Sequence, residues 1–313
     1  MKTPVIKFRL SYRPAALVLA CCCAAASGCT GEESAGEGDL QLSVSGGAAL
    51  RDGFPYTEGD ATFAFADGWA LTFSKYILAV GQVELTDPAT GQKVSGWEGP
   101  AVMDLKKDAS GSLDLVMLEG VPALRYELSF DLTAVTAAAD NRNVDQADLE
   151  LMIQSGWSVL LAGEAQRSGE PAVRFRFGLP IPTHYHKCVN GKDKTQGIAI
   201  EASKTTGAFI YAHAVHLFWD TLGTGDEDLR FDAFAAMKGD DDLVTEEELK
   251  AQDLNKLVDE NGDPLTDGSG KSIFYNDMGK LVAGQQTLYH FIIEAMRASA
   301  HFNGIGLCKV KDI

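Results

Sequence analysis

The sequence is short of positive charge. Its 313 residues include 27 Lys and Arg against 44 Asp and Glu, which gives a formal net charge of −17 at pH 7. Binding to nucleic acid requires a cationic surface that neutralises phosphates, so this balance opposes nucleic-acid binding and docking on anionic lipid. The charge fits a well-solvated surface or one that gathers cations.

Familiar catalytic signatures are also absent. The chain contains no G-x-S-x-G, H-E-x-x-H or G-x-G-x-x-G pattern. The stretch "DGSGKS" (267–272) is similar to a phosphate-binding loop, but Leu265 occupies the position of the first glycine and no strand leads into it. The absence of these motifs leads us to predict that the protein is not an enzyme. An enzyme is a third alternative, which would require an open metal position beside a general base.

Only one apolar run stands out, and it lies at the N-terminus. Four basic residues without an acid precede "AALVLACCCAAA" (15–26), which is too short to span a bilayer as a helix. The next residues, "ASGC" (26–29), resemble the lipobox of bacterial lipoproteins. This resemblance implies that a signal peptide, 1–28, is removed and that Cys29 carries lipid as the mature N-terminus. A plain secretory signal is the alternative.

The residues after the lipobox predict a location and a tether. Thr30 rather than Asp follows Cys29, which in bacteria with two membranes resembles the pattern of outer-membrane lipoproteins. Residues 29–39 are expected to form a flexible acidic tether, and ten such residues reach about 17 Å. Loss of the signal leaves 23 Lys and Arg against 44 Asp and Glu, a net charge of −21. We expect membrane contact through the lipid anchor only, with the body facing the periplasm or the cell surface, and no particular protein partner is indicated.

Cysteine is scarce in the body of the chain, where only Cys188 and Cys308 remain. In an exported protein such a pair is most simply a disulfide, although two free thiols on a metal are the alternative. The loop that the bond would close is long, so the chain-entropy model gives a stabilisation of about 4–5 kcal/mol.

The pattern of apolar residues predicts a mainly β fold, an antiparallel β-sandwich with a C-terminal helical cap. From 40 to 220, short alternating or apolar runs separated by turn residues are typical of strands, with hairpins expected at 157–182 and 197–215. A helix ending at Gly156 interrupts them. From 221 to 313, helical spacing and strong helix formers predict a cap packed on the sandwich.

Four of the six histidines stand in two short stretches, "THYHKC" and "YAHAVHLFWD". If the first stretch is extended, His184 and His186 point to one face and form a workable chelating pair. His213 and His216 are three residues apart, so they can serve one metal only if the chain bends after His213.

Further ligands for the same metal could come from Asp220 and His301. The predicted disulfide would bring His301 near His186, because its two cysteines lie close to them along the chain. Imidazole and carboxylate ligands, with the thiols oxidised, suit copper, zinc, iron or nickel. We predict one metal shared by His186, His213 and His216, with His184, Asp220 or His301 completing the set.

These histidines also have an ordinary explanation. A single histidine is usually a hydrogen-bonded polar residue, which is our interpretation of His290 on an apolar helix. The "HLFWD" stretch could be a buried aromatic junction in which Asp220 caps the next turn. Spacing alone leaves the metal site and the packing junction both open.

An acidic stretch, "MKGDDDLVTEEEL", is partly similar to the end of an EF-hand calcium loop. Two of the three early carboxylate positions of such a loop are missing. We favour a helix–helix turn in which Thr245 caps a helix and Glu248 completes a capping box, rather than calcium. A weak calcium site is the alternative, and it would use Asp240, Asp241, Asp242 and Glu248.

Two stretches resemble the periplasmic copper-binding proteins associated with methanobactin import. "LTFSKYILAVGQVELTDPATGQKV" (71–94) is similar to that family's paired strands, and "VRFRFGLPIPTHYH" (173–186) to its Phe-x-x-Gly-x-Pro strand ending near a histidine. The resemblance implies copper as the preferred metal, with His184 or His186 as a ligand. We therefore predict an outer-membrane lipoprotein that binds copper, or zinc, for capture or handover. The alternative is an envelope protein whose sandwich binds a protein or a glycan without metal.

Overall fold

The computed structural model describes residues 36–223, 227–267 and 269–313. The predicted signal peptide, the lipidation at Cys29 and most of the predicted tether lie outside the described residues. The rest of the chain forms one compact unit, so the strands and the C-terminal helices belong to a single fold. No helix among the described residues has both the length and the apolar character needed to cross a bilayer.

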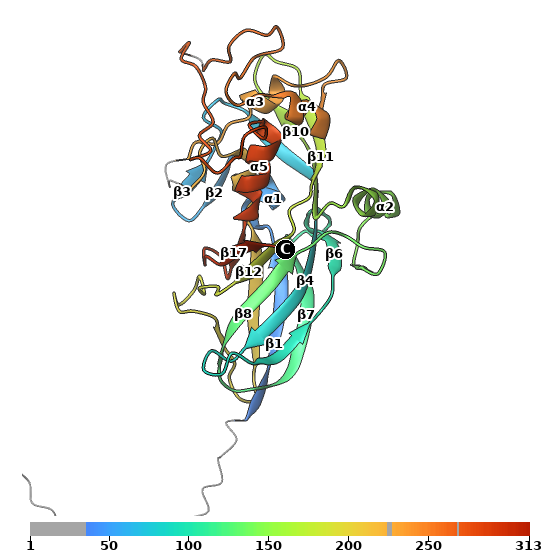
Figure 1. Ribbon diagram of the computed structural model, residues 1–313, viewed down its shortest axis with the longest axis vertical. Coiled ribbons are helices and arrows are strands. Elements are labelled where there is room, and N and C mark those ends of the chain that lie inside the picture. The colour runs from blue at the N-terminus through green and yellow to red at the C-terminus, as the bar shows by residue number, and fades with distance from the viewer. Residues whose placement is uncertain (1–35, 224–226, 268) are drawn as a thin grey trace, which may run out of the picture. The chain divides into compact units, whose positions relative to one another are not determined.

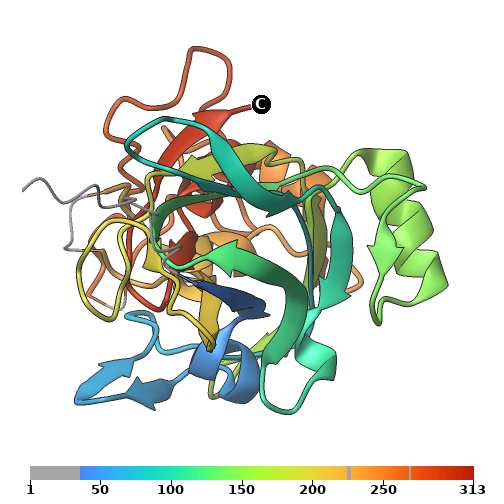
Figure 2. The same ribbon diagram turned by 90° about the horizontal axis from the view of Figure 1, so that it is seen from below.

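The fold is mainly β, as predicted, and its strands form two larger sheets around a shared core (Figure 1). Seen from below, the strands surround this core and α2 lies outside them (Figure 2). Within the described residues the first sheet has four strands in the order β16-β14-β1-β7. They are β16 (Ala300–Phe302), β14 (Thr205–Ala212), β1 (Glu37–Ser45) and β7 (Ser112–Pro122).

In the same part of the chain, the second sheet has eleven strands, seven of which follow the order β15-β11-β10-β4-β8-β12-β17. These are β15 (Leu243–Val244), β11 (Val173–Leu179), β10 (Val159–Gln166), β4 (Ala70–Thr86), β8 (Arg125–Leu132), β12 (Thr183–His186) and β17 (Lys309–Asp312). The attached strands are β5 (Lys93–Trp97), β6 (Ala101–Asp104), β9 (Asp140–Asn141) and β13 (Ile198–Ala199). A separate pair joins β2 (Tyr56–Glu58) to β3 (Ala61–Phe63).

Alternation of buried and partly exposed side chains favours a strand at β1. Leu40, Leu42 and Val44 are fully buried, and the residues between them are partly exposed. The strand begins at Glu37, so the last residues of the predicted tether belong to the sheet instead.

One predicted hairpin is confirmed and the other is wrong. β10 and β11 pair antiparallel, as expected for 157–182. Over 197–215, in contrast, β13 pairs with β8, and β14 runs parallel beside β1. The pairing with β1 lets Ala208 and Ile210 of β14 continue the buried face of the first sheet. This placement puts the end of β14 in the first sheet, with His213 and His216 directly after it.

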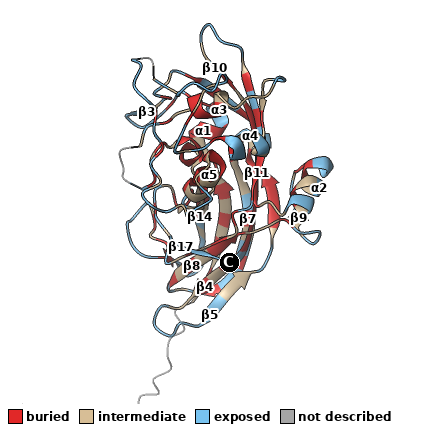
Figure 3. Ribbon diagram, turned by 45° about the horizontal axis from the view of Figure 1, so that its top comes forward, coloured by how far each residue is buried: buried red, intermediate tan, exposed pale blue. Residues whose placement is uncertain are grey.

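Helices cover the sheets without forming a layer of their own. The predicted helix ending at Gly156 is α2 (Gln146–Ser155), which packs a small second cluster of buried residues on β4, β6 and β10. Figure 3 shows buried residues concentrated in the strands and in α5. The remaining helical segments are α1 (Gly47–Asp52), η1 (Leu105–Lys107), η2 (Ala214–Phe218), α3 (Asp232–Ala235), α4 (Glu246–Ala251) and α5 (Leu288–Arg297).

The helices after residue 221 are shorter than the sequence pattern predicts. Figure 1 shows α3, α4 and α5 gathered beside β10 and β11. The chain between α4 and α5 turns repeatedly, because the carboxylates of Asp259, Asp267 and Asp277 accept backbone N–H groups two residues further on. Such local bonds offer the backbone an alternative to the helix.

Candidate metal site

Three imidazole rings meet at one end of β14. His213 follows the last residue of β14, His216 lies in η2 and His301 lies in β16. The ring centroids of His213 and His301 are 4.2 Å apart, those of His216 and His301 are 5.4 Å apart, and those of His213 and His216 are 5.8 Å apart. We refer to these three residues as the histidine cluster.

Local backbone geometry explains why these rings converge. β14 ends at Ala212, and the chain turns directly into η2 with His213 between them. This is the bend after His213 that a shared site for His213 and His216 requires. His301 joins because β16 pairs antiparallel with β14, which sets His301 opposite Tyr211.

Carbonyl oxygens determine which ring nitrogens carry protons. The His213 Nε2 lies 2.9 Å from the Gly304 carbonyl oxygen, and the His216 Nδ1 lies 3.4 Å from the Ala295 carbonyl oxygen. A carbonyl only accepts, so these nitrogens are the donors and the opposite nitrogen of each neutral ring keeps its lone pair. The His301 Nδ1 is buried and has no hydrogen-bond partner. Metal-ligating histidines are commonly held in this way, with a carbonyl on the second nitrogen.

Burial keeps the cluster uncharged. It lowers the pKa of His213, against a smaller opposing effect of the Gly304 carbonyl. Burial, helped by the two neighbouring imidazoles, lowers the pKa of His216 well below its usual value. Burial, with His213 adding to it, lowers the pKa of His301 to about 4. All three rings are therefore neutral at pH 7, which is the protonation state in which imidazole binds a metal.

Two aromatic side chains flank the cluster. The Trp219 indole stacks on the His216 ring with centroids 3.6 Å apart, and the Tyr211 ring centroid lies 4.3 Å from that of His213. The "HLFWD" stretch is therefore an aromatic packing junction and also contributes a histidine to the cluster. Trp219 belongs to the aromatic junction that the sequence offered as one alternative, whereas the contact of Tyr211 with His213 was not predicted.

Asp220, a predicted ligand, is engaged elsewhere. Its carboxylate accepts a hydrogen bond from the Arg230 Nε at 2.8 Å and others from the Thr221 hydroxyl and the Asp228 backbone N–H. The structure therefore places Asp220 in an ion pair with Arg230 and not among the three rings.

His184 and His186 form a separate group, which we call the histidine pair. They share one face of β12, as expected for residues two apart in a strand, and their rings stack with centroids 5.2 Å apart. The His184 Nδ1 lies 2.6 Å from the Asp131 Oδ1 on the neighbouring β8. The His186 Nδ1 is buried without a hydrogen-bond partner. Burial, His184 and two nearby lysines, Lys187 and Lys309, lower the pKa of His186.

The structure divides the predicted ligands between the two sheets. The pair lines a hollow of about 370 Å³ together with acidic and basic side chains, namely Glu84, Glu127, Lys187 and Lys311. In the described ranges, no ring of the pair contacts a ring of the cluster. The prediction grouped His186 with His213 and His216, but β12 belongs to the second sheet and β14 to the first. His301 is the third ring of the cluster instead.

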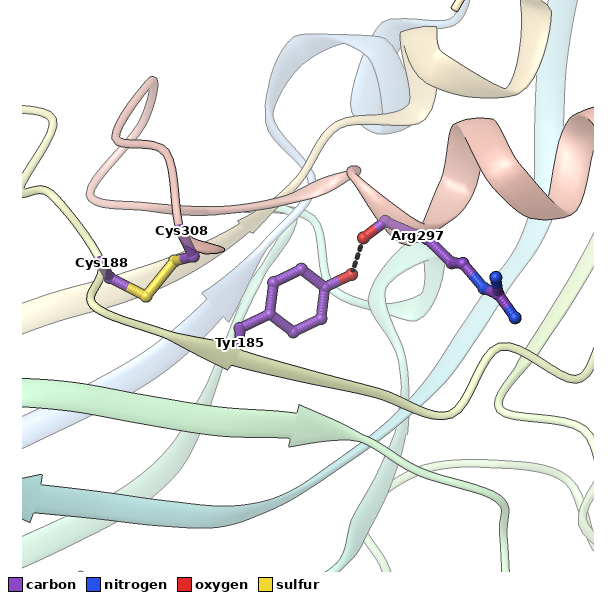
Figure 4. The surroundings of a disulfide bond; sticks show 4 residues. All are labelled: Tyr185, Cys188, Arg297 and Cys308. Atoms are coloured by element: carbon purple, nitrogen blue, oxygen red, sulfur yellow. Dashed lines mark hydrogen bonds between the residues drawn. A yellow bond between two sulfur atoms is a disulfide. The ribbon is translucent and has the colours of Figure 1, made fainter. Parts of the chain in front are cut away.

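The predicted disulfide between Cys188 and Cys308 is confirmed, with an S–S distance of 2.04 Å. It joins the residues after β12 to the segment between β16 and β17 (Figure 4). The same view shows Tyr185 of β12 pointing to the Arg297 carbonyl at the end of α5, with its hydroxyl oxygen 2.7 Å away. The end of β12 and the C-terminal segment are thus neighbours, although their histidines lie in separate groups.

The acidic stretch before α4 forms a helix cap. The Thr245 side chain and the Glu248 carboxylate make a capping box, with the Glu248 Oε2 2.9 Å from the Thr245 backbone nitrogen. The Asp241 carboxylate accepts the Leu243 backbone N–H. Our interpretation of Thr245 and Glu248 as a capping box is confirmed, which leaves the Glu248 carboxylate occupied by its own helix.

The three rings of the cluster lie close together, but their nitrogen atoms are not arranged around one point. Within the residues that the structure describes, no group of three or more His, Cys, Asp or Glu side chains is arranged to hold a metal ion. A ring whose nitrogen is about 2.0 Å from zinc has its centroid about 3.2 Å from the ion, so two rings at a tetrahedral angle have centroids about 5 Å apart. The observed 4.2–5.8 Å brackets that value. The spacing of the three rings therefore matches that of ligands around one ion, whereas their nitrogen atoms do not converge in this structure.

Comparisons with known proteins found no relative. No protein-family model matches the chain, and neither a curated protein nor a solved structure matches it significantly. The partial resemblance to copper-binding proteins associated with methanobactin import stays a prediction.

Proposed function

We propose that this protein is an outer-membrane lipoprotein that binds a transition metal ion, preferably copper, at the histidine cluster for capture or handover. The observation that carries this proposal is the convergence of three neutral imidazoles, from segments about 85 residues apart, at the spacing of rings around one ion. Carbonyl oxygens on His213 and His216 support it further, because they leave one lone pair on each ring available.

The donor set favours a borderline metal. Imidazole nitrogen suits copper, zinc, iron and nickel, whereas calcium and magnesium take oxygen ligands. The two cysteines of the body are joined in a disulfide, so no thiolate competes there for the ion. Copper comes first among these metals because of the resemblance of residues 71–186. Three protein ligands would leave a position open, which suits an ion that must be taken up and passed on.

The lipid anchor is the second part of the proposal, and it rests on the lipobox before Cys29. A Cys29→Ser variant is expected to move from the membrane fraction to the soluble fraction. Partition equal to that of the wild type would contradict the anchor without affecting the metal site.

Titration of copper and of zinc into the full-length chain tests the metal site. The variant is His213→Ala with His216→Ala, and the matched control is His290→Ala, whose ring contacts the Thr287 hydroxyl at 2.9 Å. We expect the double variant to lose more than about 100-fold in affinity, since even loss of an outer-shell partner costs about 10–100-fold. Equal affinity in the wild type and the double variant would contradict the proposal. It would favour the alternative, an envelope protein that binds a protein or a glycan without metal.

A further inference from the structure

The turn after β16 carries the carbonyl that faces His213. Residues 303–306 form this turn, which is closed by the Phe302 N–H on the Gly306 carbonyl at 2.7 Å and by the reverse bond at 3.2 Å. Gly304 has φ +95°, a conformation that a side chain would disfavour, and its carbonyl oxygen lies 2.9 Å from the His213 Nε2. The orientation of His213 therefore depends on where this turn is held.

We propose that the Cys188–Cys308 disulfide acts as a positioning element for the metal site, by holding this turn so that Gly304 fixes the tautomer and orientation of His213. The inference rests on the proposed metal binding for its functional consequence, while its structural part concerns the metal-free protein. The disulfide is called a positioning element because it acts through the turn on His213, a proposed ligand, and not on the ion itself.

Contacts on one side of the turn come from the residues that follow β12. The Val189 N–H donates to the Leu307 carbonyl at 2.8 Å, and the Gly191 N–H donates to the Phe302 carbonyl at 3.0 Å. The two segments approach so closely that a Cβ on Gly306 would lie 1.9 Å from the Val189 carbonyl oxygen. The disulfide stands at the end of this run of contacts and fastens both segments (Figure 4).

Asn303 anchors the turn on its other side. Its backbone N–H donates to the Phe209 carbonyl at 2.8 Å, and its side-chain oxygen accepts the Phe209 N–H at 2.9 Å. Asn303 has φ +49°, which asparagine tolerates better than most residues. The turn is thus fixed to β14 by Asn303, and to the residues after β12 by two backbone hydrogen bonds and the disulfide.

Little apolar packing supports the outside of the turn. Ile305 is 66% exposed and Leu307 is 64% exposed. A segment with few buried apolar contacts opens easily unless other bonds hold it. The covalent link and the backbone bonds therefore carry most of the restraint, so removal of the link is expected to release the Gly304 carbonyl from His213.

Imidazole nitrogen NMR of the metal-free, full-length chain tests this proposal directly. Two-bond nitrogen–proton correlations distinguish the Nε2–H tautomer from the Nδ1–H tautomer of each ring. We expect His213 to be the Nε2–H tautomer in the wild type and to lose that single tautomer in the Cys188→Ser, Cys308→Ser double variant. Affinity for added Zn²⁺ should fall by about 10-fold in the same variant, as for other losses of an outer-shell partner.

Two further variants separate positioning from general loosening. Asn303→Gly keeps the disulfide and the positive φ but removes the side-chain bond to Phe209, and it should also disturb the His213 tautomer. Reduction of the disulfide in the folded wild-type chain serves as the test if the double variant does not fold. Leu128→Ala, a core truncation in β8, should lower stability and leave the tautomer unchanged.

Two results would overturn the inference. One is an unchanged His213 tautomer in the disulfide variant or, where that variant does not fold, in the reduced wild-type chain. The other is an equal loss of the tautomer in Leu128→Ala. If no Zn²⁺ binds to the wild type, the proposed function fails, but the tautomer measurement still decides whether the disulfide positions His213.

Discussion

The histidine cluster and the histidine pair use the same side chain in two different settings. The cluster is largely buried, uncharged and surrounded by backbone carbonyls and aromatic rings. The pair lies on a strand face, where the Asp131 carboxylate holds His184 and several lysines lie near His186. A cation entering the cluster would meet neutral ligands with free lone pairs, whereas at the pair it would meet lysines together with the carboxylates of Asp131, Glu84 and Glu127. The surroundings, more than the number of histidines, are the reason for proposing the metal site at the cluster.

Removal of one ring from the cluster and one from the pair should give the largest difference in copper affinity. His301→Ala takes away the cluster member whose Nδ1 is buried without a partner, so we expect copper affinity to fall by more than about 100-fold. His186→Ala is expected to change affinity by only a few-fold. Competition with a chromophoric copper chelator measures both values. A larger loss for His186→Ala would reverse the comparison and assign the site to β12.

Acid should weaken the fold through the cluster. The folded-state pKa of His301 is about 4, while an unfolded chain takes up that proton near pH 6.5. The neutral ring therefore contributes stability above about pH 6.5, and this contribution is lost as the pH falls from about 6.5 to about 4.

Urea unfolding at pH 7 and pH 5 measures this effect. A His301→Asn variant has no titrating ring at this position, so it should lose less stability than the wild type between the two pH values. Asp67 has the opposite effect on stability: burial raises its pKa to about 6, so acid favours its folded state. Asp67 is present in both proteins, so it does not affect their difference. An equal loss in the wild type and the variant would show that His301 is not buried as described.

The smallest expected effect is that of Asp131→Asn on the stability of the fold. Asp131→Asn weakens the contact with His184, and because His184 is partly exposed we expect a loss of about 1 kcal/mol in the free energy of unfolding. Copper affinity should not change, since neither residue contacts the cluster. Thermal or urea unfolding gives the first value and the chelator competition gives the second. A clear loss of copper affinity would link the pair to the metal site.

Sequence patterns predicted most of the strands because alternation is a local property. Leu40, Leu42 and Val44 illustrate this, as does the hairpin of β10 and β11. The partner of β14 was not predictable in the same way. A short connection favours a hairpin, but the buried face of β14 is completed by β1, which lies far away in the sequence.

The sequence predicted that histidines would form the candidate site, but it predicted only some of the residues that belong to it. The spacing of His213 and His216 indicated that a bend was needed, and η2 supplies it. His301 was one of several possible partners, because only the register of β16 on β14 brings it beside the other two rings. The Gly304 and Ala295 carbonyls left no signal, since every residue has such a group.

The central claim is that one metal ion binds to the cluster and not to the pair. Imidazole nitrogen NMR of the nitrogen-labelled, full-length chain, before and after one equivalent of Zn²⁺, tests it most directly. We predict that the signals of His213, His216 and His301 shift together, with Nδ1 of His213 and Nε2 of His216 as the nitrogens that bind, while His184 and His186 stay unchanged. Shifts confined to His184 and His186, with the three rings of the cluster unaffected, would contradict the account.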